Sequence, residues 1–348
     1  MENTTANQPV IIERLSLLHL PLLRDISINK YRYQTNLSLF ESILANLKDL
    51  TPLITNESYT YLAIEQNRII AVLALNSFNV KSSTWFIREP LIIHNPINIT
   101  LRKLKLELLT KAISNIQKPP LNWLIKCMST DTQLISILRE LGFQPLNKYL
   151  RWNLSNQIHN DFVNTATFKS INNIASSPLS NNNVYDVMRV DQTFDSTLLK
   201  QIKDLTAQDY YRKRQIKNPI LFLTDYTNHI CIAALIYVES SNDRKLLRLI
   251  RNTAVDLNLN DFVPTFLHSI TNLLLDTDLE TLLNDTLLTK FLSEHTYVLE
   301  SEFVLLGKSS WKRNDNQTIF KTRTTFDSVF ENIDPQRPPL PTPYSSTY

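Results

Sequence analysis

Glycine is almost absent from this sequence, which holds two glycines in 348 residues. An average domain has about 7% glycine. Asparagine, isoleucine and leucine are abundant instead, a bias typical of an AT-rich genome. A glycine that remains in such a chain is expected to occupy a position that other residues fill only at a cost.

Cysteine and long apolar runs are scarce as well. The two cysteines, Cys127 and Cys231, cannot form a disulfide framework, which fits a reducing compartment. There is no Cys/His cluster, so no metal site is expected. The apolar runs fall far short of the ~20 residues of a membrane helix. Residues 1–9 are polar and lack the features of a signal peptide. We therefore expect a cytoplasmic protein without a membrane segment.

Neither sign of charge dominates the chain, whose net charge is +3, but the charge is unevenly spread. Residues 1–154 hold 17 Lys and Arg against 11 Asp and Glu, whereas the remainder holds 19 against 22. This asymmetry and the length of 348 residues predict two domains. The asymmetry is too small to indicate a nucleic-acid partner. The basic run YYRKRQIK (210–217) fits either an RNA contact or a solvated helix end.

The first half alternates strand-like and helix-like segments. An apolar helical pattern at 15–53 precedes two strand-like runs, 59–64 and 69–75, joined by a polar turn. A third strand, STWFIREPLII, leads to a polar loop and then to a helix with Thr100 as its N-cap. The strand LNWLIKCM, a helix that Asp131 opens and the strand KYLRWNL complete the pattern.

The segment LRELGFQPLNKYLRW contains Gly142, where the amphipathic helix before it must end. Glycine at the first position past a helix adopts the left-handed backbone that other residues reach only at a cost. The apolar Phe143 is expected to fold back onto the last turn. The segment thus predicts a helix stop and no ligand contact. The four tryptophans lie in expected strands and are assigned to the core: Trp85, Trp123, Trp152 and Trp311.

The second half repeats the order of the first half faintly. ILFLTDYTNHICIAALIYVES resembles the two early strands, KLLRLI the third strand, 262–275 the helix after it, and LETLL the next strand. The last segments align Phe303 with Phe143 and Trp311 with Trp152, with Glu302 in the place of the glycine. A true duplication and a chance match of leucine-rich segments are both compatible with this pattern.

This order of elements, with a helix that ends in Gly-Phe (LRELGFQPL) before the last strand, resembles the GNAT-type N-acetyltransferases. The resemblance covers residues 10–154 and, through the repeat, about 184–315. It implies an α/β (α+β) fold, a mixed twisted sheet flanked by helices, in duplicate. The expected organisation is an acetyltransferase-like domain at 1–155, an Asn/Ser-rich linker at 156–183, a degenerate acetyltransferase-like domain at 184–330 and a Pro-rich tail at 331–348.

In such enzymes the pantetheine arm of acetyl-CoA lies between two strands that splay apart, and its pyrophosphate binds N–H groups at the start of the next helix. The resemblance places the cofactor at Ile92, Ile93, Asn98, Thr100, Arg102 and Lys103. The family's glycine-rich loop is missing from HNPINITLRKLKLELL, where residues 102–105 occupy the glycine positions. The cationic side chains there either replace the lost phosphate contacts or form the solvated face of an amphipathic helix.

Acetyl transfer to an amine needs a base that takes the ammonium proton. Glu89 is the candidate carboxylate, with a merely solvent-facing role as the alternative. The family's tyrosine acid is missing, because Leu138 stands in its place, and Tyr297 lies one residue from the matching position of the second half. Cys127 is expected to be a buried thiol and His94 a surface histidine.

The resemblance implies an acyl-CoA-dependent N-acyltransferase that uses acetyl-CoA, no metal and an unknown amine acceptor. The missing glycines and tyrosine favour the alternative, a catalytically inactive acetyltransferase-like binding or scaffold protein. A third reading is an unrelated α/β protein with the same order of strands.

Overall fold

The structure is a computed structural model, and it describes residues 9–23, 58–116, 120–153, 174–180, 182–193, 195–210, 221–225, 230–241, 244–252, 277–294 and 298–309. All of them belong to one unit, Met1–Ser309. Several expectations fall outside the described residues: most of the helical pattern at 15–53, the basic run after Tyr210, the helix at 262–275, Tyr297, Trp311 and the Pro-rich tail.

The described elements of the first half are β1 (Ile11–Arg14), the 3-10 turn η1 (Leu17–His19), α1 (Leu20–Leu23), β2 (Ser58–Glu65), β3 (Arg68–Ser77), β4 (Thr84–Ile87), β5 (Leu91–Ile92), α3 (Leu101–Ser114), β6 (Asn122–Met128), α4 (Thr132–Glu140) and β7 (Gln144–Asn153). Those of the second half are β8 (Ile174–Pro178), α5 (Val184–Asp191), α6 (Thr197–Lys203), β9 (Leu221–Asp225), β10 (Ile230–Ser241), β11 (Arg244–Arg251), β12 (Thr277–Leu282), α9 (Thr286–Glu294) and β13 (Val298–Ser309). None of the helices in the described ranges is long and apolar enough to cross a membrane.

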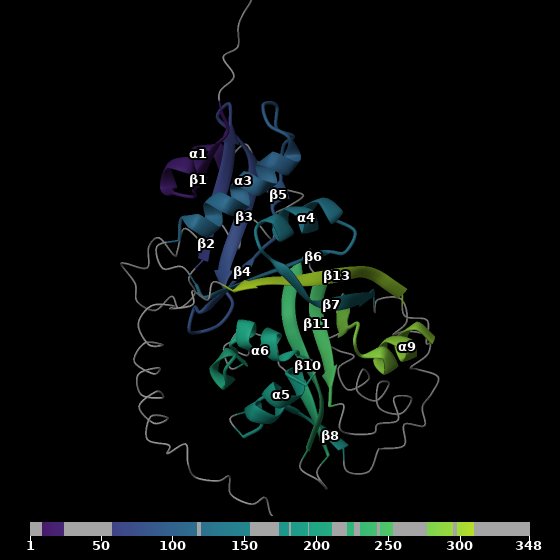
Figure 1. Cartoon of the computed structure of the whole chain (residues 1–348). Coiled ribbons are helices and arrows are strands. Elements are labelled where there is room, and N and C mark those ends of the chain that lie inside the picture. The colour runs from purple at the N-terminus through teal and green to yellow at the C-terminus, as the bar shows by residue number, and fades with distance from the viewer. Residues whose placement is uncertain are drawn as a thin grey trace, which may run out of the picture. The chain divides into compact units, whose positions relative to one another are not determined.

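Thirteen strands of the described chain form one mixed sheet (Figure 1). Their order is β1-β2-β3-β4-β6-β13-β7-β12-β11-β10-β9-β8, with β5 beside β3. The strands β8, β9, β10, β11 and β12 pair in the same sequence as β1, β2, β3, β4 and β6, including one parallel pair in each half, β4–β6 and β11–β12. A helix and a last strand follow in both halves. The duplicated mixed sheet that the sequence predicts is therefore present.

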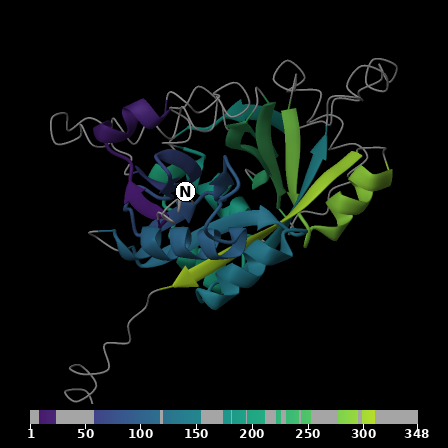
Figure 2. The same cartoon turned by 90° about the horizontal axis from the view of Figure 1, so that it is seen from above.

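The two halves exchange their last strands. β13 lies between β6 and β7, and β7 lies between β13 and β12. β13 pairs antiparallel with both of its neighbours, for example Phe303 with Met128 of β6 and with Tyr149 of β7. Figures 1 and 2 show β13 (yellow) running from the neighbourhood of α9 to the strands of the first half. Each half thus completes its sheet with a strand of the other.

The turn between β3 and β4 binds the end of α6 and adds a second connection between the halves. The Asn79 amide donates to the carbonyl oxygens of Lys203 and Asp204, at 3.2 and 3.1 Å. The Thr84 hydroxyl donates to the carbonyl oxygen of Ile202, at 2.5 Å. Because Asn79 and Thr84 are buried, these bonds replace water at groups that would be costly to leave unpaired.

Helix α4 ends as the sequence predicts. Gly142 has φ +86°, its N–H donates to the carbonyl of Arg139, and the Phe143 N–H donates to the carbonyl of Leu138, both at 2.9 Å. This pair of bonds is the Schellman motif, which satisfies the last carbonyls of a helix. Phe143 is buried in the main core of the first half. Gly142 is therefore a helix stop, as expected.

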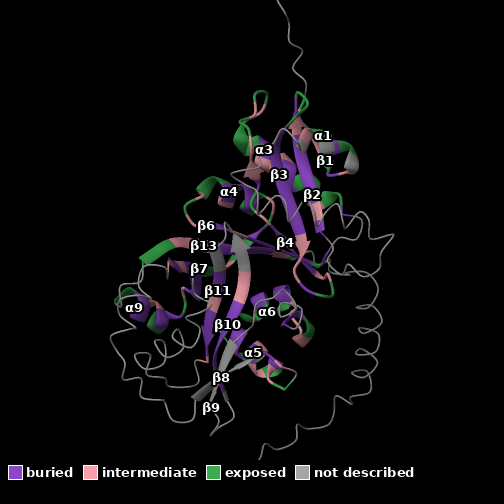
Figure 3. Cartoon of the chain, turned by 180° about the vertical axis from the view of Figure 1, so that it is seen from behind, coloured by how far each residue is buried: buried purple, intermediate pink, exposed green. Residues whose placement is uncertain are grey.

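The main core of the first half lies between one face of the sheet and the helices α3 and α4. Trp85 and Trp123 pack there with Leu104 and Leu108 of α3 and Leu138 of α4. The opposite face carries a second cluster formed with α6: Leu124, Tyr149, Leu199, Ile202, Leu282 and Leu305. Figure 3 shows the buried residues (purple) along β2 and β3, which are covered on both faces. The expected core role is confirmed for Trp85, Trp123 and Trp152, which are all buried.

The register of the repeat needs a correction. Asp131 and Asp285 accept hydrogen bonds from the N–H groups of Leu134 and Leu288, three residues on in each case, and so open the equivalent helices α4 and α9. The repeats are thus 154 positions apart at this point, so Phe143 corresponds to position 297 and not to Phe303. The sequence alignment was wrong because β13 is longer than β7 and equally leucine-rich.

Two expected segments look different in the structure. The third strand of the first half is interrupted, since β4 and β5 are separated by Arg88–Pro90. The segment 156–183, expected as a linker, contains β8, which pairs antiparallel with β9 at the end of the sheet. The boundaries of the two expected domains remain a prediction.

Candidate functional site

Strands β4 and β5 form one strand with an extra residue in the middle. Leu75 of β3 faces Ile87 of β4, and Val72 of β3 faces Leu91 of β5. Three steps along β3 therefore correspond to four steps along the other strand, which is a β-bulge. Bulges bend a strand, and here the bend separates β5 from β6. Pairing between β4 and β6 ends at Ile87 and Ile125, and no described strand pairs with β5 on the side of β6.

The backbone of Ile92 faces this gap. The N–H of Ile93 donates to the carbonyl of Ile70 at 2.8 Å. Ile93 and Ile70 are therefore a hydrogen-bonded pair of the antiparallel ladder. Because hydrogen-bonded and non-hydrogen-bonded pairs alternate along such a ladder, the next pair, Ile92 and Ala71, is non-hydrogen-bonded. The N–H and C=O of Ile92 consequently point away from β3. The two predicted cofactor residues differ: Ile92 presents its backbone to the gap, whereas the N–H of Ile93 is occupied.

Glu89 lies at the point where the strands part. Its side chain is exposed at the bulge, and its Oε1 accepts a hydrogen bond from the N–H of Met128 in β6 at 3.1 Å. The carboxylate thus connects the end of β4 with the end of β6.

The loop between β5 and α3 is organised around a buried carboxylate that sequence reasoning missed. The side chain of Glu65 accepts hydrogen bonds from the N–H groups of Ile97 and Asn98, both at 2.8 Å. Glu65 is 3% exposed. Two loop N–H groups therefore already bind an anion that belongs to the chain. A glutamate at the end of a strand carries no sequence signal for this role.

The start of α3 agrees with the prediction. The hydroxyl of Thr100 accepts a hydrogen bond from the N–H of Lys103 at 3.3 Å and caps the helix. The helix begins at Leu101, so Arg102 and Lys103 lie in its first turn and not in the preceding loop. The predicted residues Asn98 and Thr100 are exposed beside this helix start, which carries a partial positive charge.

The basic side chains of α3 have partners within the fold. Arg102 forms an ion pair with Glu140 of α4. Lys103 lies 3.8 Å from Glu107, one turn further along α3. Lys105 lies 3.3 Å from the N-cap carboxylate Asp131. These contacts fit the solvated face of an amphipathic helix that also ties α3 to α4.

Cys127 and Leu138 have the structural roles that the sequence suggests. Both side chains are fully buried in the core under α3 and α4. Burial, together with the nearby charge of Glu89, raises the pKa of the Cys127 thiol to about 12, so the thiolate is not available at neutral pH. The residue that corresponds to Leu138 in α9 is Leu292, also fully buried, and Tyr297 therefore does not take the place of the missing tyrosine acid.

A buried ion cluster lies where the two halves meet, and sequence reasoning missed it. Glu280 of β12 is fully buried and accepts from Arg248 of β11, at 2.8 and 2.7 Å, and from Lys126 of β6. Burial alone would raise the pKa of Glu280, but Arg248 and Lys126 outweigh it and lower the pKa. Lys126 and Glu280 occupy equivalent positions of the two repeats, so the cluster joins the halves at matching points.

A second buried group adjoins this cluster. Lys203 donates to Asp195 at 2.6 Å, and the Tyr210 hydroxyl donates to Asp191 at 2.5 Å. Burial lowers the pKa of Lys203, but Tyr149, Asp191 and Asp195 around it raise it more, so the net shift is upward. Lys203 thus keeps its proton. Burial and Asp191 also raise the pKa of Tyr210, which stays neutral.

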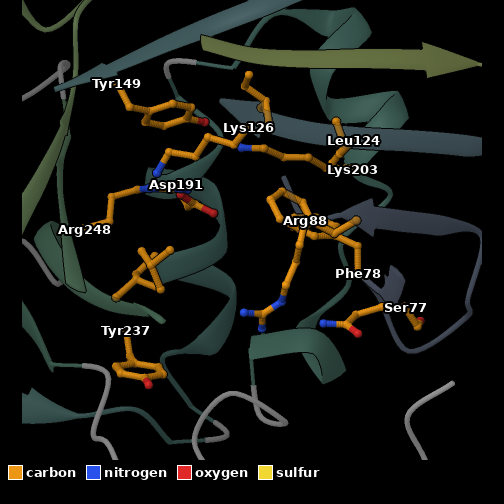
Figure 4. A pocket seen from close by; sticks show the side chains of 15 residues that line it. Ser77, Phe78, Arg88, Leu124, Lys126, Tyr149, Asp191, Lys203, Tyr237 and Arg248 are labelled. Atoms are coloured by element: carbon orange, nitrogen blue, oxygen red, sulfur yellow. The ribbon is translucent and has the colours of Figure 1, made fainter. Parts of the chain in front are cut away.

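A pocket of about 230 Å³ lies against these buried groups (Figure 4). It is lined by Asn76, Ser77, Phe78, Phe86, Arg88, Leu124, Lys126, Tyr149, Asp191, Lys203, Ile236, Tyr237, Val238, Arg248 and Leu305. Both halves contribute, so neither half alone forms it. In the part of the chain that the structure describes, no three His, Cys, Asp or Glu residues are grouped so as to hold a metal.

Comparison with known proteins identifies the fold. No family model matches the sequence, and no curated protein matches it significantly. The structure is similar to a tandem GNAT protein from the clavulanic acid biosynthesis pathway, with a TM-score of 0.53 and 8% identity over 88% of this chain and 100% of that chain. The chain has the GNAT acetyltransferase fold.

Two further solved structures are similar to nearly the same share of this chain. One is the GCN5-related glucosamine N-acetyltransferase region of a fungal multi-domain GH3 β-N-acetylglucosaminidase, with a TM-score of 0.52 and 11% identity over 87% of this chain and 38% of that chain. The other is a Drosophila protein, with a TM-score of 0.50 and 11% identity over 86% of this chain and 99% of that chain. The resemblance implies two neighbouring strands that splay apart. In this chain, the strand formed by β4 and β5 parts from β6.

Proposed function

We propose that the chain is an acyl-CoA-dependent N-acyltransferase whose cofactor site lies in the first half, between β5 and β6. The observation that carries the proposal is the β-bulge at Arg88–Pro90, after which β5 leaves β6 and the backbone of Ile92 faces an unfilled strand position. An amide-bearing pantetheine arm has the donor and acceptor groups that such a backbone needs. The fold similarity supports the same assignment.

All of the predicted site residues except Ile93, whose N–H is bound to the carbonyl of Ile70, have a part in this proposal. Ile92 would bind the pantetheine arm through its backbone, and Asn98, Thr100, Arg102 and Lys103 lie at the helix start that would receive the CoA phosphates. Acetyl-CoA, when bound, supplies the activated acyl thioester. Glu89 would take the proton of the amine acceptor, because its carboxylate stands at the parting of the strands.

The second half is proposed to bind no cofactor. Arg248 and Glu280 are ladder partners at the end of the β11–β12 pairing, and they are bound to each other at 2.7 Å. A buried ion pair thus stands where β11 and β12 part, whereas the end of the β4–β6 pairing carries Ile87 and Ile125. This asymmetry predicts one acyl-CoA site per chain.

A second candidate function is a binding module without catalysis. Glu65 occupies two loop N–H groups, and the Met128 N–H is bound to Glu89, so part of the backbone that a cofactor would use is already satisfied. Under this reading the GNAT fold has kept its architecture, and the chain's own carboxylates occupy backbone donors that the cofactor would use.

Thermal unfolding of the full chain in acetyl-CoA tests the proposal. A specific ligand stabilises the folded state by RT ln(1 + [L]/Kd), about 2.7 kcal/mol at 100 times Kd, which moves the unfolding temperature by several degrees. No shift at millimolar acetyl-CoA would overturn the acyltransferase assignment.

Release of CoA thiol in the presence of amine acceptors separates the two candidate functions. Spermidine, glucosamine and a lysine-containing peptide serve as acceptors. The transferase predicts that Glu89→Gln still binds acetyl-CoA but loses about 10²–10⁴-fold in transfer rate. Glu294→Gln, at an exposed position of α9, serves as the matched control and should be unchanged. Binding without transfer to any acceptor would favour the binding module.

A further inference from the structure

The pocket between the halves has one charged side chain that the fold leaves without a partner. Among the described charged residues that line the pocket, the side chain of Arg88 alone has no ion pair or hydrogen bond within the described chain. The other cations are held by carboxylates: Lys126 and Arg248 by Glu280, and Lys203 by Asp195. Figure 4 shows the Arg88 side chain pointing into the pocket.

Among the described residues, the charges that line the pocket and their direct partners leave one positive charge in excess. Four cations, Arg88, Lys126, Lys203 and Arg248, face three carboxylates, Asp191, Asp195 and Glu280. Asp191 already accepts from Tyr210, and the other two carboxylates are paired with lysine or arginine. The uncompensated charge therefore resides on the Arg88 guanidinium. A guanidinium recognises planar anions through two parallel N–H donors.

The rest of the pocket wall is apolar and aromatic. Phe78 and Phe86 stack at a centroid distance of 6.3 Å, and Leu124, Leu305 and Tyr237 complete this side. The volume of the pocket is about 230 Å³. It is below the ~300–1,000 Å³ of sites for drug-sized ligands, so the occupant is small.

We propose that this pocket binds a small monocarboxylate with an apolar body, whose carboxylate pairs with Arg88 and whose apolar part lies on Phe78 and Phe86. A phosphate ester fits less well, because its charge of about −1.5 to −2 exceeds the single uncompensated cation. A protonated amine is disfavoured as a ligand, because the excess positive charge of the pocket would repel it. The site goes beyond the proposed acyltransferase, and it needs both halves of the chain.

Calorimetric titration of the full chain without acyl-CoA tests the proposal. The probes are butanoate, hexanoate and 3-phenylpropanoate, with 3-phenylpropanamide as the neutral match of the last and benzyl phosphate as the dianionic alternative. We expect saturable one-to-one binding of at least one carboxylate, about tenfold or more tighter than the amide because a charged hydrogen bond is lost in the amide. No saturable binding of any carboxylate, equal binding of the amide, or tighter binding of benzyl phosphate would overturn it.

Two Arg88 variants locate the site. Arg88→Met keeps most of the side-chain volume and should weaken carboxylate binding about tenfold or more, while Arg88→Lys, which keeps the charge but loses the fork, should weaken it less. Arg139→Met, on the exposed end of α4, is the matched control. Unchanged affinity in Arg88→Met would contradict the proposal. If that variant does not fold, as circular dichroism would show, the comparison of acid and amide on the natural chain still decides.

Discussion

Gly142 and Gly307 have been kept for two different physical reasons. Gly142 has φ +86°, and a side chain at its position would have contact with Lys308 only at an ordinary distance of 3.8 Å, so backbone conformation alone explains it. Gly307 lies in β13, where a Cβ atom would clash with the side chain of Leu146. Sequence reasoning predicted the first case from the helix before it. It could not predict the second, because the clash arises from a strand exchange between the halves.

Replacement of Gly142 measures the strain of the helix stop. We expect Gly142→Ala to lower the free energy of unfolding by about 1–2 kcal/mol, because a Cβ in the left-handed region meets the following carbonyl oxygen. Gln133→Ala, at an exposed position of α4, is the control and should change stability by less than about 0.5 kcal/mol. Urea unfolding gives both values. Equal stability of the two variants would refute the account of Gly142.

The two thiols provide a test at the same scale. Burial raises the pKa of both Cys127 and Cys231 to about 12, against an ordinary value of about 8.5. Below the pKa that the thiols have in the unfolded chain, they are protonated in both the folded and the unfolded chain, so their contribution to stability is fully present. This contribution is lost as pH rises toward 12. We expect neither thiol to react with a disulfide reagent at pH 8 in the folded chain, and both to react after unfolding. Rapid reaction of one thiol in the folded chain would contradict the burial.

At the scale of elements, the ion cluster of Glu280 holds β12 to β11 and to β6. We expect Glu280→Gln to cost about 3–5 kcal/mol, since it leaves Arg248 and Lys126 buried without their carboxylate. Glu302→Gln breaks an exposed pair with Lys148 and should cost at most about 1 kcal/mol. Urea unfolding at pH 7 gives the free energy of unfolding of both variants. A similar loss in both would show that the buried cluster contributes no more to stability than an exposed ion pair.

The cluster also sets a pH dependence. Because the pKa of Glu280 in the folded chain lies below its ordinary value, its contribution is present at neutral pH and is lost as pH falls through the folded pKa. The natural chain should therefore lose stability toward acid more steeply than Glu280→Gln. If the free energy of unfolding of the natural chain and of Glu280→Gln fell equally steeply below pH 5, the lowered pKa of Glu280 would be contradicted.

The sequence predicted the elements better than their register. The β2–β3 hairpin, the Thr100 and Asp131 caps and the Gly142 stop follow from local patterns, and all are present. The offset between the repeats was wrong, because a leucine-rich strand has no residue that marks its register. The Glu280 cluster and the Arg88 pocket were missed, since their members lie on strands far apart in the sequence and meet only through the exchange of β7 and β13.

At the scale of the whole molecule, the exchange of last strands makes the two halves interdependent. β13 lies between two strands of the first half, and β7 pairs with β12 of the second. The halves thus share one sheet, one buried ion cluster and one pocket, whereas the proposed acyl-CoA site belongs to the first half alone. The order of strands is present twice, and a buried ion pair stands at the end of the parallel pairing in the second half, where the first half has Ile87 and Ile125.

Backbone hydrogen exchange with and without acetyl-CoA shows whether acetyl-CoA binds between β5 and β6 of the first half. We expect slower exchange on binding in residues 88–100 and 122–129, where β5 and β6 part, and no change in the corresponding strands of the second half, 244–252 and 277–282. Protection confined to the second half, or no protection anywhere at saturating acetyl-CoA, would contradict this expectation.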